Sequence, residues 1–291
     1  MQHLLSTRFH GGLIGGNIIY ITPQQIAPNQ LTIDTTPAIM AGIASLIRCG
    51  GFDDQDWLQS TNVAKNPERA ILAMLPLMLF FHEDRPKLRE IIINVSQSWE
   101  LDWETCTSAV AIGYIISRSI SETFSPSAIL SQLLDEMTNL HPLLFQQLST
   151  IDRLLEQSSS LYQVTQRSIS ATHPIITPTV LAIYCFLCTP EDFSLAIRRA
   201  HQIEDRSPLI CALTGILAGV QNSSTGIPLN GLLATPQREQ WLTAAENLLN
   251  LWAGVYHPDR ASAIGLLPSS HQPVMTYALP VAAPKVMQRR N

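Results

Sequence analysis

The chain has 291 residues, of which 46% are hydrophobic and only 14% are charged. Because a soluble domain usually carries about a quarter charged residues, this composition predicts one compact body with a large core, or a body partly covered by a partner. The formal net charge of −5 and the lack of a dense run of Lys and Arg argue against a nucleic-acid-binding protein, which normally presents a basic face.

No segment of the sequence is long and apolar enough to span a bilayer. The longest apolar run, residues 70–81, is interrupted by Pro76, whereas a spanning helix needs about twenty apolar residues. Residues 1–8 lack the charged stretch, apolar stretch and cleavage site of a secretory signal peptide. We therefore expect a cytoplasmic protein without a membrane span.

The five cysteines are an odd, scattered set and do not form the framework of a disulfide-rich protein. Cys185 and Cys188 have the spacing of a redox pair, but they come near the end of an apolar helical run. A redox cysteine is usually activated at a helix N-terminus. The sequence therefore predicts plain core thiols.

The helix starts share one signal, a hydroxyl residue followed by proline, as at Thr36. The same pair recurs at Ser125, Thr177, Thr189 and Thr235, each time before an apolar run. Proline suits the first helical turn because its missing N–H costs nothing there, and the hydroxyl oxygen before it can accept a free backbone N–H. Each pair predicts a helix with a hydroxyl cap.

Between these starts the apolar residues recur every three or four positions, as in residues 39–47 and 129–137. Residues 110–120 and 209–220 are apolar nearly all round, which predicts helices buried in the middle of the fold. In the second of these, Gly215 and Gly219 are spaced so that a neighbouring helix can approach closely.

Only residues 17–21 and 90–95 could be strands, and the second stretch fits better in a helix that begins near Pro86. The chain is therefore predicted to be all-α, with roughly ten or more helices joined by short polar loops. We expect one helical domain over residues 1–267. Residues 268–291, which contain several prolines, are predicted to be an extended or disordered tail.

Three stretches carry a recognisable order of motifs. The chain opens with Arg-Phe-His-Gly-Gly-Leu-Ile-Gly at residues 8–15, and Thr-Ile-Asp-Thr at residues 32–35 leads into a helical run at residues 41–52. Residues 180–219 hold three successive helical runs, the last of them with Gly-Ile-Leu-Ala-Gly. Together the three stretches resemble the ADP-ribosylglycohydrolase family, one of whose bacterial members removes ADP-ribose from an arginine of nitrogenase reductase.

The resemblance implies an all-α domain with two metal ions, usually Mg²⁺ or Mn²⁺, at the mouth of a cleft. Hard divalent cations take oxygen ligands, and two of them close together need several carboxylates to offset their repulsion. In the family's Thr-Asp-Asp-Thr motif this chain keeps Thr32, Asp34 and Thr35. It has Ile33 in place of the first aspartate.

The second metal-binding motif of the family, Asp-Thr-Asp-Thr, is replaced more completely. Counted back from Gly215, its four positions fall on Arg206, Ser207, Pro208 and Leu209. Arginine is a cation in a cation site, and proline and leucine offer no side-chain oxygen. The resemblance therefore predicts a lost dinuclear site, with these residues and residues 32–35 as its vestige.

A few carboxylates remain near the two motifs. A one-residue gap would bring Glu204 or Asp205 opposite the first lost aspartate, so that one weakly bound Mg²⁺ between Asp34 and Asp205 is an alternative to no cofactor at all. The simpler interpretation is that Asp34 caps a helix ahead of Pro37 and that residues 204–206 form a solvated loop.

The sequence therefore predicts a pseudoenzyme, with no catalytic residue, that acts by binding a protein partner. One alternative is a residual metal-dependent hydrolase of N-glycosyl bonds with displaced ligands. Another is a protein that binds ADP-ribose or a nucleotide, with Arg206 facing a phosphate. The sequence does not predict the partner or the oligomeric state.

Overall fold

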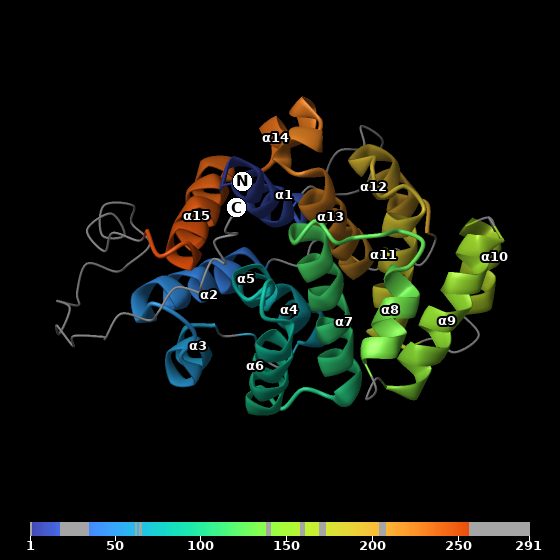
Figure 1. Cartoon of the computed structure of the whole chain (residues 1–291), viewed down its shortest axis with the longest axis horizontal. Helices are drawn as coiled ribbons and strands as arrows, with labels where there is room; N and C mark the ends of the chain where they lie inside the picture. The colour runs from blue at the N-terminus through green and yellow to red at the C-terminus, as the bar shows by residue number, and fades with distance from the viewer. Residues whose placement is uncertain are drawn as a thin grey trace, which may run out of the picture.

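The computed structural model describes residues 2–17, 35–61, 63, 66–137, 141–157, 161–168, 173–203 and 208–255. Every regular element within these ranges is a helix, which confirms the predicted all-α class (Figure 1). The elements are α1 (Gln2–Gly15), α2 (Thr36–Cys49), α3 (Asp54–Ser60), α4 (Pro67–Ala73), α5 (Leu75–Phe80), α6 (Arg85–Ser98), α7 (Trp103–Ile120), α8 (Ile129–Glu136), α9 (Pro142–Glu156), α10 (Leu161–Ser168), α11 (Ile176–Leu187), α12 (Phe193–His201), α13 (Pro208–Asn222), η2 (Ser224–Gly226), α14 (Leu229–Ala234) and α15 (Arg238–Trp252).

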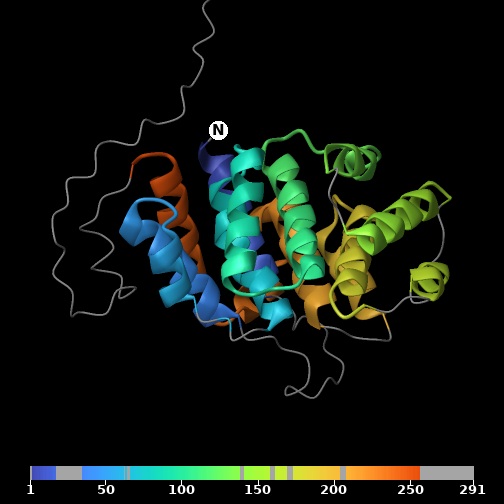
Figure 2. The ribbon, with the colours of Figure 1, turned by 90° about the horizontal axis from the view of Figure 1, so that it is seen from below.

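Three helices form the centre of the molecule. The sequence predicts that residues 110–120 and 209–220 are buried all round, and almost every residue of α7 and α13 is indeed buried. The whole of α11 is buried as well. In Figure 1, α2, α3 and α15 lie on one side of this centre and α9 and α10 on the other. Figure 2 shows the helices standing side by side from α2, in blue, through α6 and α7 to α9.

The closest helix packing in the molecule joins α1 to α13 through glycines. A Cβ atom added to Gly11 would lie 2.0 Å from the carbonyl oxygen of Gly219, and one added to Gly15 would lie 2.1 Å from that of Gly215. Only glycine leaves room for two backbones at this separation. The pairing of Gly11 with Gly219 and of Gly15 with Gly215 also shows that the two helices run antiparallel. The predicted close approach at Gly215 and Gly219 is therefore confirmed.

The apolar run at residues 70–81 forms two short helices. Helix α4 ends at Ala73, and α5 begins at Leu75 with Pro76 in its first turn. Proline cannot donate the backbone hydrogen bond that a continuous helix would need there. None of the described helices is both long and apolar enough to cross a membrane.

The hydroxyl–proline pairs do lie at helix starts, but the predicted hydroxyl caps are wrong. Helix α8 begins at Ile129, three residues beyond Pro126, and α12 begins at Phe193 with Asp192 as its cap. At α11 the Thr177 hydroxyl accepts the N–H of His173 and does not cap the helix. The capping groups are instead carboxylates and amides at the N-cap. Their side-chain oxygen can reach and accept the backbone N–H three residues further along the chain. The residues whose carboxylate or amide oxygen caps a helix in this way are Asp53, Asn66, Asp84, Asp102 and Asp192.

The cysteines are all free. Cys185 is fully buried, and burial raises the pKa of its thiol well above the ordinary value; burial also raises the pKa of Cys188. A thiol with a raised pKa is a poor nucleophile and a poor redox partner. Cys185 is a core thiol, as predicted, whereas Cys188 is only partly buried and packs against the core. The predicted tail at residues 268–291, the domain boundary at residue 267 and all but the first residue of the stretch 17–21 lie outside the described residues.

Candidate functional site

One end of the helical body gathers the first turns of several helices. The Thr214 hydroxyl of α13 donates to the Ala182 carbonyl of α11 at 3.4 Å, and the Asn222 amide donates to the Pro190 carbonyl at 2.9 Å. The two helices therefore run parallel and begin at the same end. Because α1 is antiparallel to α13, its C-terminal turn lies at this end too.

Part of the predicted vestige of the metal site lies at this end of the molecule, at the start of α13. Of its residues the structure describes Thr35, which directly precedes α2, and Pro208 and Leu209, which form the first turn of α13. The others, Thr32, Ile33, Asp34, Glu204, Asp205, Arg206 and Ser207, lie outside the described residues.

The described part of the second motif does not fit a divalent cation. The Leu209 side chain is completely buried, and it packs within the hydrophobic core. Pro208 is the first residue of α13, where its ring offers no donor atom. Neither side chain supplies the oxygen that Mg²⁺ or Mn²⁺ requires.

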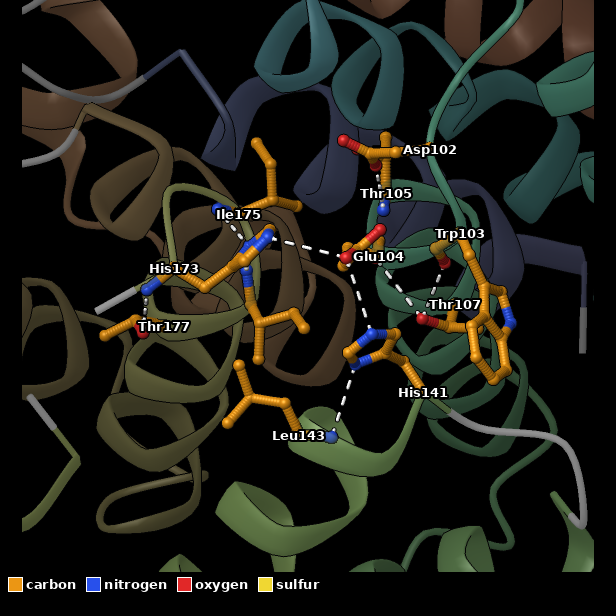
Figure 3. Close-up of polar contacts among 11 residues, drawn as sticks. Asp102, Trp103, Glu104, Thr105, Thr107, His141, Leu143, His173, Ile175 and Thr177 are labelled. Atoms are coloured by element: carbon orange, nitrogen blue, oxygen red, sulfur yellow. Dashed lines mark hydrogen bonds and ion pairs between the residues drawn. The ribbon is translucent and has the colours of Figure 1, made fainter. Parts of the chain in front are cut away.

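A different polar cluster occupies the starts of α7, α9 and α11 (Figure 3). It consists of Glu104 in the first turn of α7, His141 at the N-cap of α9 and His173 just ahead of α11. The Nε2 atoms of His141 and His173 lie 3.4 Å and 3.7 Å from the same atom, Oε1 of Glu104. The three side chains are 25%, 21% and 24% exposed, in that order, so the cluster is reached by solvent but is held by the fold.

The hydrogen bonds of the second ring nitrogen, Nδ1, indicate which nitrogen carries the proton in each neutral imidazole. Nδ1 of His141 accepts the N–H of Leu143 at 3.2 Å. Nδ1 of His173 accepts the N–H groups of Ile175 and Ile176 at 3.3 Å and 3.4 Å. A nitrogen that accepts a hydrogen bond carries no proton, so a neutral ring with this geometry has its proton on Nε2. Both Nε2–H groups are therefore directed toward the Glu104 carboxylate.

This pattern argues that the cluster is not a metal centre. A histidine that binds a metal through Nε2 gives that nitrogen's lone pair to the ion and donates its Nδ1–H to a neighbouring acceptor. In His141 and His173, Nδ1 faces backbone donors instead. Among the residues that the structure describes, no group of three or more His, Cys, Asp or Glu side chains is placed to hold a metal ion.

The start of α7 is fixed by several further contacts. The Asp102 carboxylate accepts the N–H of Thr105 at 2.7 Å, and the Thr107 hydroxyl donates to the carbonyl of Trp103 at 2.9 Å. The ring of Trp103 packs edge-on against His141, with 5.0 Å between the ring centroids. Asp102 and Glu104 place negative charge in the first turn, where the helix dipole favours it.

The sequence analysis missed this cluster because its members are far apart in the chain and follow no known spacing. A local signal was present, however. Both histidines precede proline, as His141-Pro142 and His173-Pro174, at the start of a helix. The same residue–proline pattern that marks other helix starts could have indicated that these two imidazoles lie at helix N-termini.

These observations define the class of protein. It is an all-α body in which α1 and α13 cross at glycines and several helices start at one end. The sequence model of the ADP-ribosylglycohydrolase family matches residues 10–258. The chain therefore belongs to the ADP-ribosylglycohydrolase family.

Comparison of structures gives the same fold. A solved structure described as an ADP-ribosylglycohydrolase-related protein complex is similar with a TM-score of 0.62 and 16% sequence identity. The match covers 87% of this chain and 98% of that chain. No curated protein sequence matches the chain.

Proposed function

We propose that this chain is a catalytically inactive member of the ADP-ribosylglycohydrolase family and that it acts by binding another protein. The observation that carries the proposal is the start of α13, where Pro208 and the fully buried Leu209 stand at two metal-ligand positions of the family motif. No rotamer of the buried Leu209 side chain can supply a metal ligand, because the side chain has no donor atom.

The remaining motif positions support the same conclusion. Ile33 replaces an aspartate, and Arg206 adds a positive charge where two cations would have to sit. Asp34 is the one motif carboxylate that stays in register. Two divalent ions held mainly by one carboxylate would repel each other more strongly than their ligands could offset.

Protein binding is favoured by the side chains at the rim of this end. Trp103 is 51% exposed and Phe145 is 46% exposed. The ring of Trp103 packs against the His141 imidazole, and Phe145 follows one turn further along α9, where its N–H donates to the His141 carbonyl at 3.0 Å. Exposed aromatic residues are enriched at protein interfaces.

The loss of catalysis can be tested directly. The purified chain is mixed with an ADP-ribosylated arginine substrate and Mn²⁺ or Mg²⁺, beside an active family member, and released ADP-ribose is measured. We expect no release above background. Metal-dependent release at a rate near that of the active enzyme would overturn the proposal.

A restored variant serves as the matched control for this experiment. Ile33→Asp, Arg206→Asp and Pro208→Asp together return three carboxylates to the motif positions. Calorimetry should show metal uptake by the variant and none by the wild type. Metal uptake by the wild type would instead favour the alternative of a residual metal-dependent hydrolase. Binding of ADP-ribose to the wild type would favour a nucleotide-binding protein, with Arg206 as the phosphate partner.

The binding role is tested by affinity capture from the native host. The full chain is compared with Trp103→Ala and with Leu229→Ala, which removes an exposed leucine from α14. We expect a partner that is captured by the full chain and by Leu229→Ala and lost from Trp103→Ala. A chain truncated after residue 267 tests whether residues 268–291 contribute to partner binding. Equal capture by all three full-length proteins would contradict an interface at the Trp103 rim.

A further inference from the structure

A second polar site lies at the other ends of α9 and α11. A cavity of about 580 Å³ opens between the last turns of these two helices, α10, α12 and the segment before α8. Helix α11 is twelve residues long, so this cavity is roughly 15 to 20 Å from the Glu104 cluster. Its volume falls within the range of about 300 to 1,000 Å³ that is typical of small-molecule sites.

The walls of the cavity are partly apolar. Leu154, Leu187 and the ring of Tyr184 are buried, and Leu155 and Leu161 complete the apolar lining. The apolar part of the lining favours a ligand that brings an apolar group of its own.

Side chains of opposite charge line this cavity without forming an ion pair with one another. Arg199 of α12 lines it, as do Asp152 and Glu156 of α9. Among the ion pairs of the described residues none joins Arg199 to either carboxylate. The Arg199 guanidinium donates instead to the Thr189 hydroxyl at 3.3 Å.

The Asp152 carboxylate is not neutralised by its surroundings. Partial burial raises its pKa above the ordinary value, and the nearby negative charge of Glu156 raises it further. The C-terminal end of α9, which carries a partial negative charge, is close by and also favours a cation. This side of the cavity is therefore suited to a positively charged group, and the Arg199 side is suited to a carboxylate.

We infer that this cavity binds a small zwitterion, an α-amino acid with an apolar side chain. Its carboxylate would pair with Arg199, its ammonium group with Asp152 and Glu156, and its side chain would lie among the leucines. Arginine suits a carboxylate because its planar guanidinium can donate two parallel hydrogen bonds. The inference does not depend on the proposed function, because none of these residues belongs to the metal-site end.

The ligand class is tested on the wild-type protein by calorimetry with L-leucine and L-phenylalanine at millimolar concentrations. Two analogues of leucine that lack one charge serve as controls: 4-methylpentanoate has no ammonium group, and 3-methylbutylamine has no carboxylate. We expect saturable binding of at least one amino acid and at least tenfold weaker binding of both analogues.

The position of the site is tested with Arg199→Gln and Asp152→Asn. Each should weaken binding of the amino acid about tenfold or more, because each removes one charge-assisted hydrogen bond. The matched controls Arg198→Gln and Asp135→Asn alter exposed charges that do not line the cavity, and they should bind as the wild type does. Thermal unfolding of each variant checks that it is folded.

Three results would overturn the inference. One is the absence of saturable binding for both amino acids. Another is equal affinity of the wild type for an amino acid and for its one-charge analogue. The third is unchanged affinity in both Arg199→Gln and Asp152→Asn, which would place the binding elsewhere on the protein.

Discussion

The α1–α13 crossing and the cluster at the starts of α7, α9 and α11 show how differently two regions of one fold depend on their residues. At the crossing, two backbones approach so closely that Gly11, Gly15, Gly215 and Gly219 leave no room for a Cβ atom. At the cluster, Glu104 and its histidines are partly exposed and meet at 3.4 Å or more.

The difference teaches that the helix crossing and the polar cluster are under separate physical constraints. Steric exclusion at the crossing admits no side chain larger than that of glycine at these four positions. The side chains of Glu104, His141 and His173 are partly exposed, so their chemistry can change while the helices stay in place. We therefore expect the chain to keep its fold when residues of the cluster are replaced.

The largest effect is expected at the crossing. In Gly219→Ala the new Cβ would lie 2.0 Å from the Gly11 carbonyl oxygen, so the helices must move apart. We expect a loss of about 3 kcal/mol or more in the free energy of unfolding, measured by urea denaturation. Gly51→Ala is the matched control, because nothing lies within 4 Å of its added Cβ. A tolerated Gly219→Ala would contradict the steric account of the crossing.

A slightly smaller loss of stability is expected at low pH, from the buried His82 in the core beside α1. His82 is buried between the rings of Phe9 and Trp252 and donates from Nδ1 to the Leu79 carbonyl at 2.7 Å. Burial lowers the pKa of His82 to about 4. The unfolded chain takes up this proton near the ordinary histidine pKa of about 6.5, whereas the folded chain resists it. Stability should therefore fall by about 3 kcal/mol as pH drops from 7 to 4.

The measurement is urea denaturation across this pH range for the wild type and for His82→Phe, which keeps an aromatic ring in the site. The variant should lose most of this dependence on pH. A smaller part should remain, because burial also lowers the pKa of His10. Parallel curves for the two proteins would show that His82 is not the group responsible.

At the cluster the expected effects are smaller, and the type of replacement decides their size. His141→Ala removes the acceptor for the Leu143 N–H and should cost about 1 kcal/mol. His141→Asn keeps an N-cap acceptor and should cost less. Hydrogen exchange of the first turn of α9 is the measurement. Equal protection in the two variants would contradict the capping role of the imidazole.

The smallest effect is expected for Glu104→Gln. The amide keeps an oxygen toward the two Nε2–H groups but removes the charge, and the partly exposed position screens that charge. We expect a change of about 1 kcal/mol or less in the free energy of unfolding. A loss as large as that of Gly219→Ala would mean that the cluster and the crossing are constrained alike.

Much of the fold could be predicted from local sequence. The buried helices at residues 110–120 and 209–220 are visible as apolar runs because a helix in the middle of a fold has no polar face. The helix starts are visible at proline because its ring suits the first turn. The capping groups were predicted wrongly, since a hydroxyl before proline does not by itself place its oxygen against the free N–H groups.

The sequence alone predicted that Ile33, Arg206, Pro208 and Leu209 stand where the family has metal ligands, since the types of the side chains limit what they can bind. Only the tertiary structure decided that Gly215 and Gly219 meet Gly15 and Gly11. Only the tertiary structure brought Glu104, His141 and His173 together, and placed Arg199 and Asp152 on one cavity. The physical reason is that helix periodicity is a local property, whereas contacts between helices depend on packing between segments that are far apart in the chain.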